Sequence, residues 1–136
     1  MEFQPAGEII GDKHRVRTIR ITEAPDLPDG EYRFIDMYCT DSNCDCRKTM
    51  IQVVHNRRFV ALINYGWESP LFYQKWNGGD ADSPPMSGAS IDITSPDLVS
   101  CVGILSLFNA LLNDEWKKLF KSHYTLVKAK LAACSQ

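Results

Sequence analysis

The feature that most constrains the fold is a change in the spacing of apolar residues, which alternate along most of the chain and follow helical spacing near its end. In one alternating segment, Met37 falls on one face of a strand, and Phe34 and Tyr38 fall on the other. Asn56-Arg57 suits a tight turn between two strands. This pattern predicts strands over 15–21, 32–39, 47–55, 59–65 and 90–94.

Two helices are predicted after the last strand. Ser95-Pro96-Asp97 offers a capping hydroxyl, a proline suited to the first turn and an acid for the positive helix end. The helix over 96–112 is apolar nearly all round, so we expect it to be central. The helix over 115–132 has one apolar side: Trp116, Leu119, Phe120, His123, Val127 and Leu131. The predicted fold is α+β, with four to five mostly antiparallel strands in meander order followed by two C-terminal helices packed on one face.

The length of 136 residues fits one domain, 1–136, in which we expect residues 1–13 to be poorly ordered and 77–88 to form an exposed loop. A formal charge of -2 argues against nucleic acid as a partner. The N-terminus lacks the basic start and apolar run of a secretory signal. The longest apolar stretch, 101–112, is too short to cross a bilayer. We therefore expect a cytoplasmic protein without a membrane partner.

Three of the five cysteines lie within eight residues, at Cys39, Cys44 and Cys46. If 32–39 and 46–54 pair as a hairpin, Cys39 and Cys46 face each other and Cys44 lies in the connecting loop. Thiolates repel one another unless a cation compensates, and zinc favours tetrahedral sites rich in cysteine. This spacing predicts a bound zinc ion.

Other interpretations of the three thiols stay open. A Cys39–Cys46 disulfide is geometrically possible across a hairpin, although a reducing compartment disfavours it. The one-residue gap between Cys44 and Cys46 departs from plant-type iron–sulfur spacing. Three unligated thiols or a catalytic thiol are the remaining alternatives.

A fourth zinc ligand must come from elsewhere in the chain. His123 is our prediction, because it is an imidazole on the inward side of the last helix. An inward histidine is also commonly a core residue hydrogen-bonded to its surroundings. The other candidates are Cys101, His55 and Asp41.

The segment 65–76 is rich in aromatic residues, which are enriched at binding surfaces. Alternatively, these rings cover the edge of a small core. Glu68 has no evident carboxylate partner for acid–base chemistry. The predicted interaction surface consists of Tyr65, Trp67, Glu68, Phe72, Tyr73 and Trp76.

The run Tyr38-Cys39-x4-Cys44-Asp45-Cys46-Arg47, the segment 64–69 and the pair His123-Tyr124 occur in that order. Together they resemble a family of small uncharacterised bacterial proteins with a Y-C-x4-C-D-C-R motif, a Y-G-W-E-S segment and a helix ending in H-Y. The likeness spans about 32–131 and departs from the family mainly in 77–88 and the first thirty residues. It implies a common domain and carries no activity, partner or ligand set.

These observations favour a zinc-stabilised domain that acts as a protein-binding or accessory module rather than an enzyme. The alternative is a hydrolase-like enzyme in which three cysteines hold zinc and a water fills the fourth position. Glu68 or His123 would then assist proton transfer. A third class, thiol redox chemistry, would require a cysteine of depressed pKa.

Overall fold

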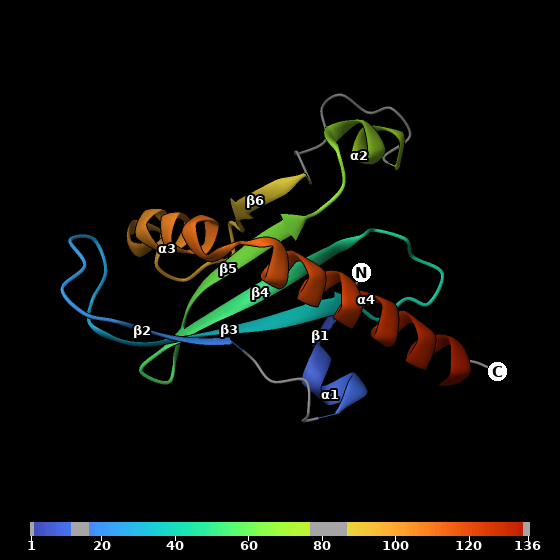
Figure 1. Cartoon of the computed structure of the whole chain (residues 1–136), viewed down its shortest axis with the longest axis horizontal. Coiled ribbons are helices and arrows are strands. Elements are labelled where there is room, and N and C mark those ends of the chain that lie inside the picture. Colours follow the sequence, from blue (N-terminus) through green and yellow to red (C-terminus); the bar gives the residue numbers. More distant parts are fainter. Residues whose placement is uncertain (1, 12–16, 77–86, 135–136) are drawn as a thin grey trace.

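The computed structural model describes residues 2–11, 17–76 and 87–134 (Figure 1). Within these ranges the fold is α+β, with a six-stranded sheet in which every strand pair is antiparallel. The strands are β1 (Phe3–Pro5), β2 (Arg17–Ile21), β3 (Gly30–Cys39), β4 (Lys48–His55), β5 (Arg58–Gly66) and β6 (Gly88–Ile91). The helices are α1 (Ala6–Ile10), α2 (Pro70–Trp76), α3 (Leu98–Leu111) and α4 (Asp114–Cys134).

The strand order confirms the predicted meander. β3, β4, β5 and β6 are neighbours in sequence order, and both β1 and β2 pair with β3 on its other side. Within the N-terminal segment, the described residues 2–11 contain β1 and α1. The predicted loop 77–88 falls outside the described residues except at Ser87 and Gly88, where β6 begins.

The turn between β4 and β5 follows directly from two residues in the left-handed region. Asn56 has a φ of 49° and Arg57 a φ of 65°, and His55 pairs with Arg58 across them. Two central residues with positive φ define the hairpin turn whose twist matches the twist of a sheet. This turn sets the pairing next to it, and the register of β4 on β5 shifts once, between Val53 and Val54.

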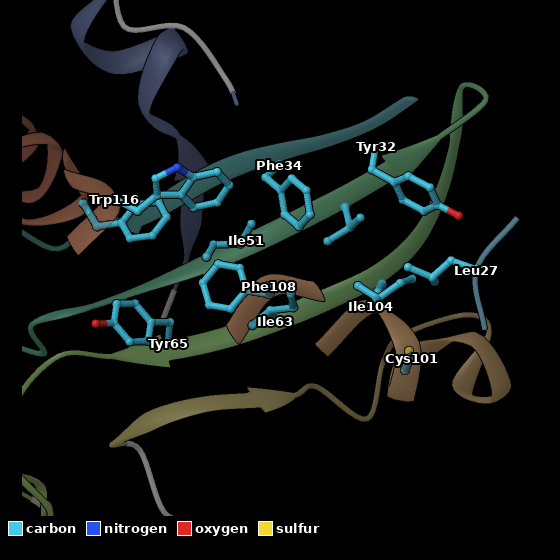
Figure 2. Close-up of a cluster of buried hydrophobic side chains, with 13 residues drawn as sticks. Leu27, Tyr32, Phe34, Ile51, Ile63, Tyr65, Cys101, Ile104, Phe108 and Trp116 are labelled. Atoms are coloured by element: carbon cyan, nitrogen blue, oxygen red, sulfur yellow. The ribbon is translucent and has the colours of Figure 1, made fainter. Parts of the chain in front are cut away.

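The two C-terminal helices lie across one face of the sheet, as predicted (Figure 1). Alternate residues of β3, such as Tyr32 and Phe34, point to that face and are buried. Phe108 of α3 and Trp116 of α4 pack on the Phe34 ring (Figure 2). The core therefore lies between the sheet and these helices.

α3 is less central than predicted. Cys101, Ile104 and Phe108 face the core, whereas Val99 and Val102 are 91% and 72% exposed. An apolar pattern all round a helix cannot reveal which side the rest of the chain covers. Among the strands, α3 packs mainly on β5 and β6. In the described ranges, neither α3 nor α4 alone has the length and apolar character of a membrane-spanning helix, whereas the two together, bent by 96°, would fit by length and composition.

Candidate metal centre

The three predicted cysteines converge at one end of the β3–β4 hairpin. Cys39 is the last residue of β3, Cys46 lies two residues before β4 begins, and Cys44 lies in the loop between them. Their sulfur atoms all lie within 4.8 Å of one another. Sulfurs that share a tetrahedral zinc at about 2.3 Å lie about 3.8 Å apart, so a small contraction would suffice to bind the ion.

Hydrogen bonds within the loop hold the backbone around Cys44 in place. The Asp41 carboxylate accepts a hydrogen bond from the Asn43 amide at 2.9 Å, and the Asp41 carbonyl accepts one from the Cys44 amide at 3.1 Å. The Asp41 amide in turn donates to the Cys39 sulfur at 3.4 Å. An N–H group directed at sulfur stabilises a thiolate, as outer hydrogen bonds do in metal sites.

α4 reaches this loop through Tyr124 and Lys128, which are four residues apart and therefore on one side of the helix. Lys128 donates to the Cys39 carbonyl at 3.1 Å and to the Asp41 carbonyl at 2.8 Å. The Tyr124 hydroxyl donates to Asp45 at 3.1 Å. Neither residue was predicted to contact the cysteine loop, although their spacing on a helix next to His123 was a usable signal.

His123 points inward as predicted, but it is paired with Asp36. Its Nδ1 atom lies 2.6 Å from Oδ2 of Asp36, and the Tyr38 hydroxyl donates to that same oxygen at 2.6 Å. Among the described residues, the group of potential ligand atoms that includes the three sulfurs contains no histidine nitrogen and no carboxylate oxygen. Ligation by His123 through Nε2 therefore stays a prediction. A carboxylate paired with an imidazole is found both beside metal-binding histidines and beside buried core histidines that bind no metal.

The other candidates for the fourth ligand also lie outside the sulfur group. Cys101 belongs to the core under α3, where its thiol donates to the Asp97 carbonyl at 3.1 Å. His55 pairs with Tyr32 near the start of β3, at the end of that strand opposite Cys39. Asp41 is in the cysteine loop, but one of its oxygens binds the Asn43 amide.

Burial raises the pKa of all three clustered thiols above the ordinary value. The charge of the Cys46 sulfur raises the pKa of Cys44 further, whereas the Lys128 ammonium lowers the pKa of each thiol. Reactive cysteines have a depressed pKa. The raised pKa of these three thiols is opposite in direction to that of a reactive cysteine.

The aromatic segment divides into buried and accessible residues. Tyr65 and Tyr73 are only 5% and 2% exposed, so these two of the six predicted surface residues belong to the interior. Trp67 is half-buried against the Tyr124 ring, with centroids 5.2 Å apart. Trp76 is accessible, and so is Leu71, which was not among the predicted surface residues.

Arg47 links the cysteine loop to this segment. Its guanidinium makes two hydrogen bonds to Asp45, lies 3.5 Å from Glu68 and stacks over the Phe72 ring at 4.5 Å. Its carbonyl accepts a hydrogen bond from the Tyr73 hydroxyl at 2.6 Å. Arg47 therefore connects the cysteine loop directly to α2.

Comparison with known proteins adds no relative: no family model, no curated protein and no solved structure matches the chain.

Proposed function

We propose that the chain is a small zinc-binding domain in which Cys39, Cys44 and Cys46 hold the ion and the domain acts as a protein-binding or accessory module. The observation that carries this proposal is the convergence of three sulfurs within 4.8 Å, two of them on fully buried residues. Zinc fits because cysteine-rich sites prefer it over hard cations such as magnesium or calcium. A reducing, cytoplasmic location would keep the thiols available.

The surroundings of the sulfurs support a cation at this position. Three thiolates and one zinc dication leave one net negative charge, which the Lys128 ammonium beside the cluster offsets. The Asp41 amide on the Cys39 sulfur adds a further stabilising dipole. Bound zinc would tie the ends of β3 and β4 to their loop, which already contacts α4.

The module would meet its partner through α2 and the half-exposed rings beside it. Leu71 is 57% exposed, and Trp76 lies on the same short helix. Arg47 connects that helix to the cysteine loop, so the metal would fix the position of the contact surface. An apolar surface with aromatic residues is typical of protein recognition.

Elemental analysis of the purified chain, together with thiol counts before and after chelation, tests the metal. We expect about one zinc per chain and three thiols that become reactive on chelation. Cys44→Ser should abolish retention of the metal, whereas Cys134→Ser, at an exposed cysteine outside the cluster, should leave it unchanged. A metal-free protein whose clustered thiols all react freely would overturn the proposal.

The second candidate is the hydrolase-like enzyme, and one observation favours it. No fourth protein ligand joins the sulfur group in the described residues, and catalytic zinc sites keep one position open for water. The visible spectrum of the cobalt-substituted protein separates the two functions. A shift on adding an exogenous ligand such as azide indicates an open position. An unresponsive spectrum that changes in His123→Gln indicates a closed site with His123 as ligand.

A further inference from the structure

A hollow on the sheet face away from α3 and α4 is lined by three arginines from separate elements. Its volume is about 420 Å³, within the range of small-molecule sites. Arg20 comes from β2, Arg33 from β3 and Arg57 from the β4–β5 turn. Glu31 and Arg33 alternate with Tyr32 and Phe34, which face the helices, so they point to the opposite face. In Figure 1 this end of the sheet is where the β4–β5 turn lies beside β2 and β3.

The charges in the hollow are unbalanced. Among the described residues of the lining, three guanidinium groups oppose one carboxylate, that of Glu31, which gives these residues a net charge of +2 in a chain whose total is -2. Arg20 lies 3.5 Å from Glu31, and both side chains are largely exposed, so this pair neutralises little of the local potential. Within ranges 2–11, 17–76 and 87–134, the side chains of Arg33 and Arg57 have no hydrogen bond or ion pair. Two guanidiniums therefore have their donors available.

Two residues beside the hollow have backbone conformations with positive φ. Arg57 has a φ of 65°, a conformation in which glycine is preferred and an arginine is strained. Gly30 has a φ of 133°, and a Cβ there would lie 2.8 Å from Nε2 of His55. Glycine thus lets the start of β3 approach the turn that carries Arg57. Strained residues of this kind occur often at ligand sites.

We propose that this hollow binds a small molecule through a phosphate group, with Arg33 and Arg57 as the principal ligands. A guanidinium offers paired donors that match phosphate oxygens, and a phosphate dianion balances the net charge of the lining. The Asn56 side chain, also in the lining, can add a neutral donor. Val54 provides an apolar wall for the rest of the ligand. The proposal does not depend on the metal, because the hollow lies at the end of β3 opposite Cys39.

Titration of the full chain with pyrophosphate in about 20 mM salt, followed by calorimetry or amide chemical shifts, tests this site. We expect saturable binding that weakens about tenfold or more in Arg33→Gln and in Arg57→Gly. Arg57→Gly also removes the backbone strain, so a failure to fold should not obscure the result. Glu31→Gln should act in the opposite direction and tighten binding, because it removes the one carboxylate among the described residues of the lining.

Arg58→Gln is the matched control. Arg58 is the next residue, equally cationic and exposed, but it lines a different hollow on the helix side of the turn. Its replacement should change pyrophosphate affinity less than twofold, an estimate of roughly 0.4 kcal/mol. Equal losses in Arg57→Gly and Arg58→Gln would reduce the effect to general electrostatics and overturn the site. Tighter binding of citrate than of pyrophosphate would overturn the assignment to phosphate.

Discussion

Arg57 holds a left-handed backbone conformation with a φ of 65° in the β4–β5 turn. This conformation destabilises the folded state by about 1–2 kcal/mol for a residue with a Cβ atom, whereas glycine adopts it freely. Glycine also lowers the free energy of unfolding by about 0.4–1 kcal/mol, because it gives the unfolded chain more conformational freedom. We therefore expect Arg57→Gly to raise the free energy of unfolding by about 0.5 kcal/mol, measured by denaturant titration.

Arg58→Gly serves as the control for this change. Arg58 begins β5 and pairs with His55, so glycine there should lower the free energy of unfolding by about 0.5–1 kcal/mol. A stability loss in both variants would show that the Arg57 side chain stabilises the fold more than the strain destabilises it.

Asp36 accepts hydrogen bonds in the interior from partners that are distant in sequence. Tyr38 donates to it at 2.6 Å, and His123 approaches the same oxygen from α4. Burial is the main reason that the pKa of Tyr38 is raised well above its usual value. Tyr38→Phe should lower the free energy of unfolding by about 1–2 kcal/mol, because a buried charge-assisted hydrogen bond is lost.

Tyr65→Phe provides the comparison for Tyr38→Phe. Both rings are buried, but in the described part of the chain the Tyr65 hydroxyl makes no hydrogen bond to another protein group. Calorimetric unfolding of the two variants should therefore differ, with a change below about 0.5 kcal/mol for Tyr65→Phe. Equal losses would mean that the Tyr38 hydroxyl contributes nothing specific.

The inward direction of His123 followed from the helical spacing of its neighbours, but its pairing with Asp36 did not. The apolar spacing over 115–132 fixes which side of α4 faces the sheet, and the structure confirms that side. The position of α4 along β3 determines which strand residue each helix side chain contacts. That position depends on packing of large rings such as Phe120 and Trp116, and no local pattern encodes it.

At the scale of elements, β2, β3, β4 and β5 were predictable because each is bounded by a turn signal and has a regular alternation. The strand predicted over 90–94 shares only two residues with β6, which ends at Ile91. β1 and α1 were not predictable, because three-residue and five-residue elements hold too few residues for a period to show. β1 forms because β3 extends as far as Cys39 and offers Phe3 and Gln4 a partner edge. The exposed side of α3 could not be predicted either, because an apolar residue does not indicate whether another part of the chain covers it.

Gly103 lies inside α3, where alanine would usually be preferred. A Cβ atom at this position would lie 2.9 Å from the Asp26 carbonyl oxygen and 3.1 Å from a methyl group of Leu27. Alanine gains about 1 kcal/mol in helix propensity, but overpacking against a backbone carbonyl costs about 1–3 kcal/mol. We expect Gly103→Ala to lower the thermal midpoint, as measured by circular dichroism.

Ser106→Ala on the same helix separates propensity from packing. Ser106 is exposed, so alanine there should raise stability slightly, by about 0.5 kcal/mol. A stabilising Gly103→Ala would show that α3 can move away from the 26–27 segment at little cost.

At the scale of the molecule, β3 joins two chemically different ends. The sulfur group lies at its C-terminal end, and the arginine-lined hollow lies at its start. Metal removal should therefore act locally. Chelation should speed hydrogen exchange at Cys44, whose amide is held by the Asp41 carbonyl, by about tenfold or more. Amides around the β4–β5 turn should keep their rates, and an equal increase at both ends would mean that the metal supports the whole fold.

Acid and base should affect the metal-free and zinc-loaded proteins in opposite directions. In the metal-free fold, burial raises the pKa of the three thiols, so the folded state holds protons that the unfolded state releases above about pH 8.5. Its stability should therefore fall as the pH rises through that range. In the zinc-loaded fold the same sulfurs are thiolates, so their stabilising effect is present at high pH and is lost on acidification.

The difference in thermal midpoint between protein with zinc and protein with chelator should consequently widen from pH 6 to pH 9. At a free zinc concentration of about 100 times the dissociation constant, the metal adds about 2.7 kcal/mol. Because up to three protons compete with the ion, its affinity should weaken steeply on acidification. Cys134→Ser should reproduce the pattern and Cys44→Ser should remove it. A midpoint difference that is independent of pH would indicate that the thiols are not the ligands.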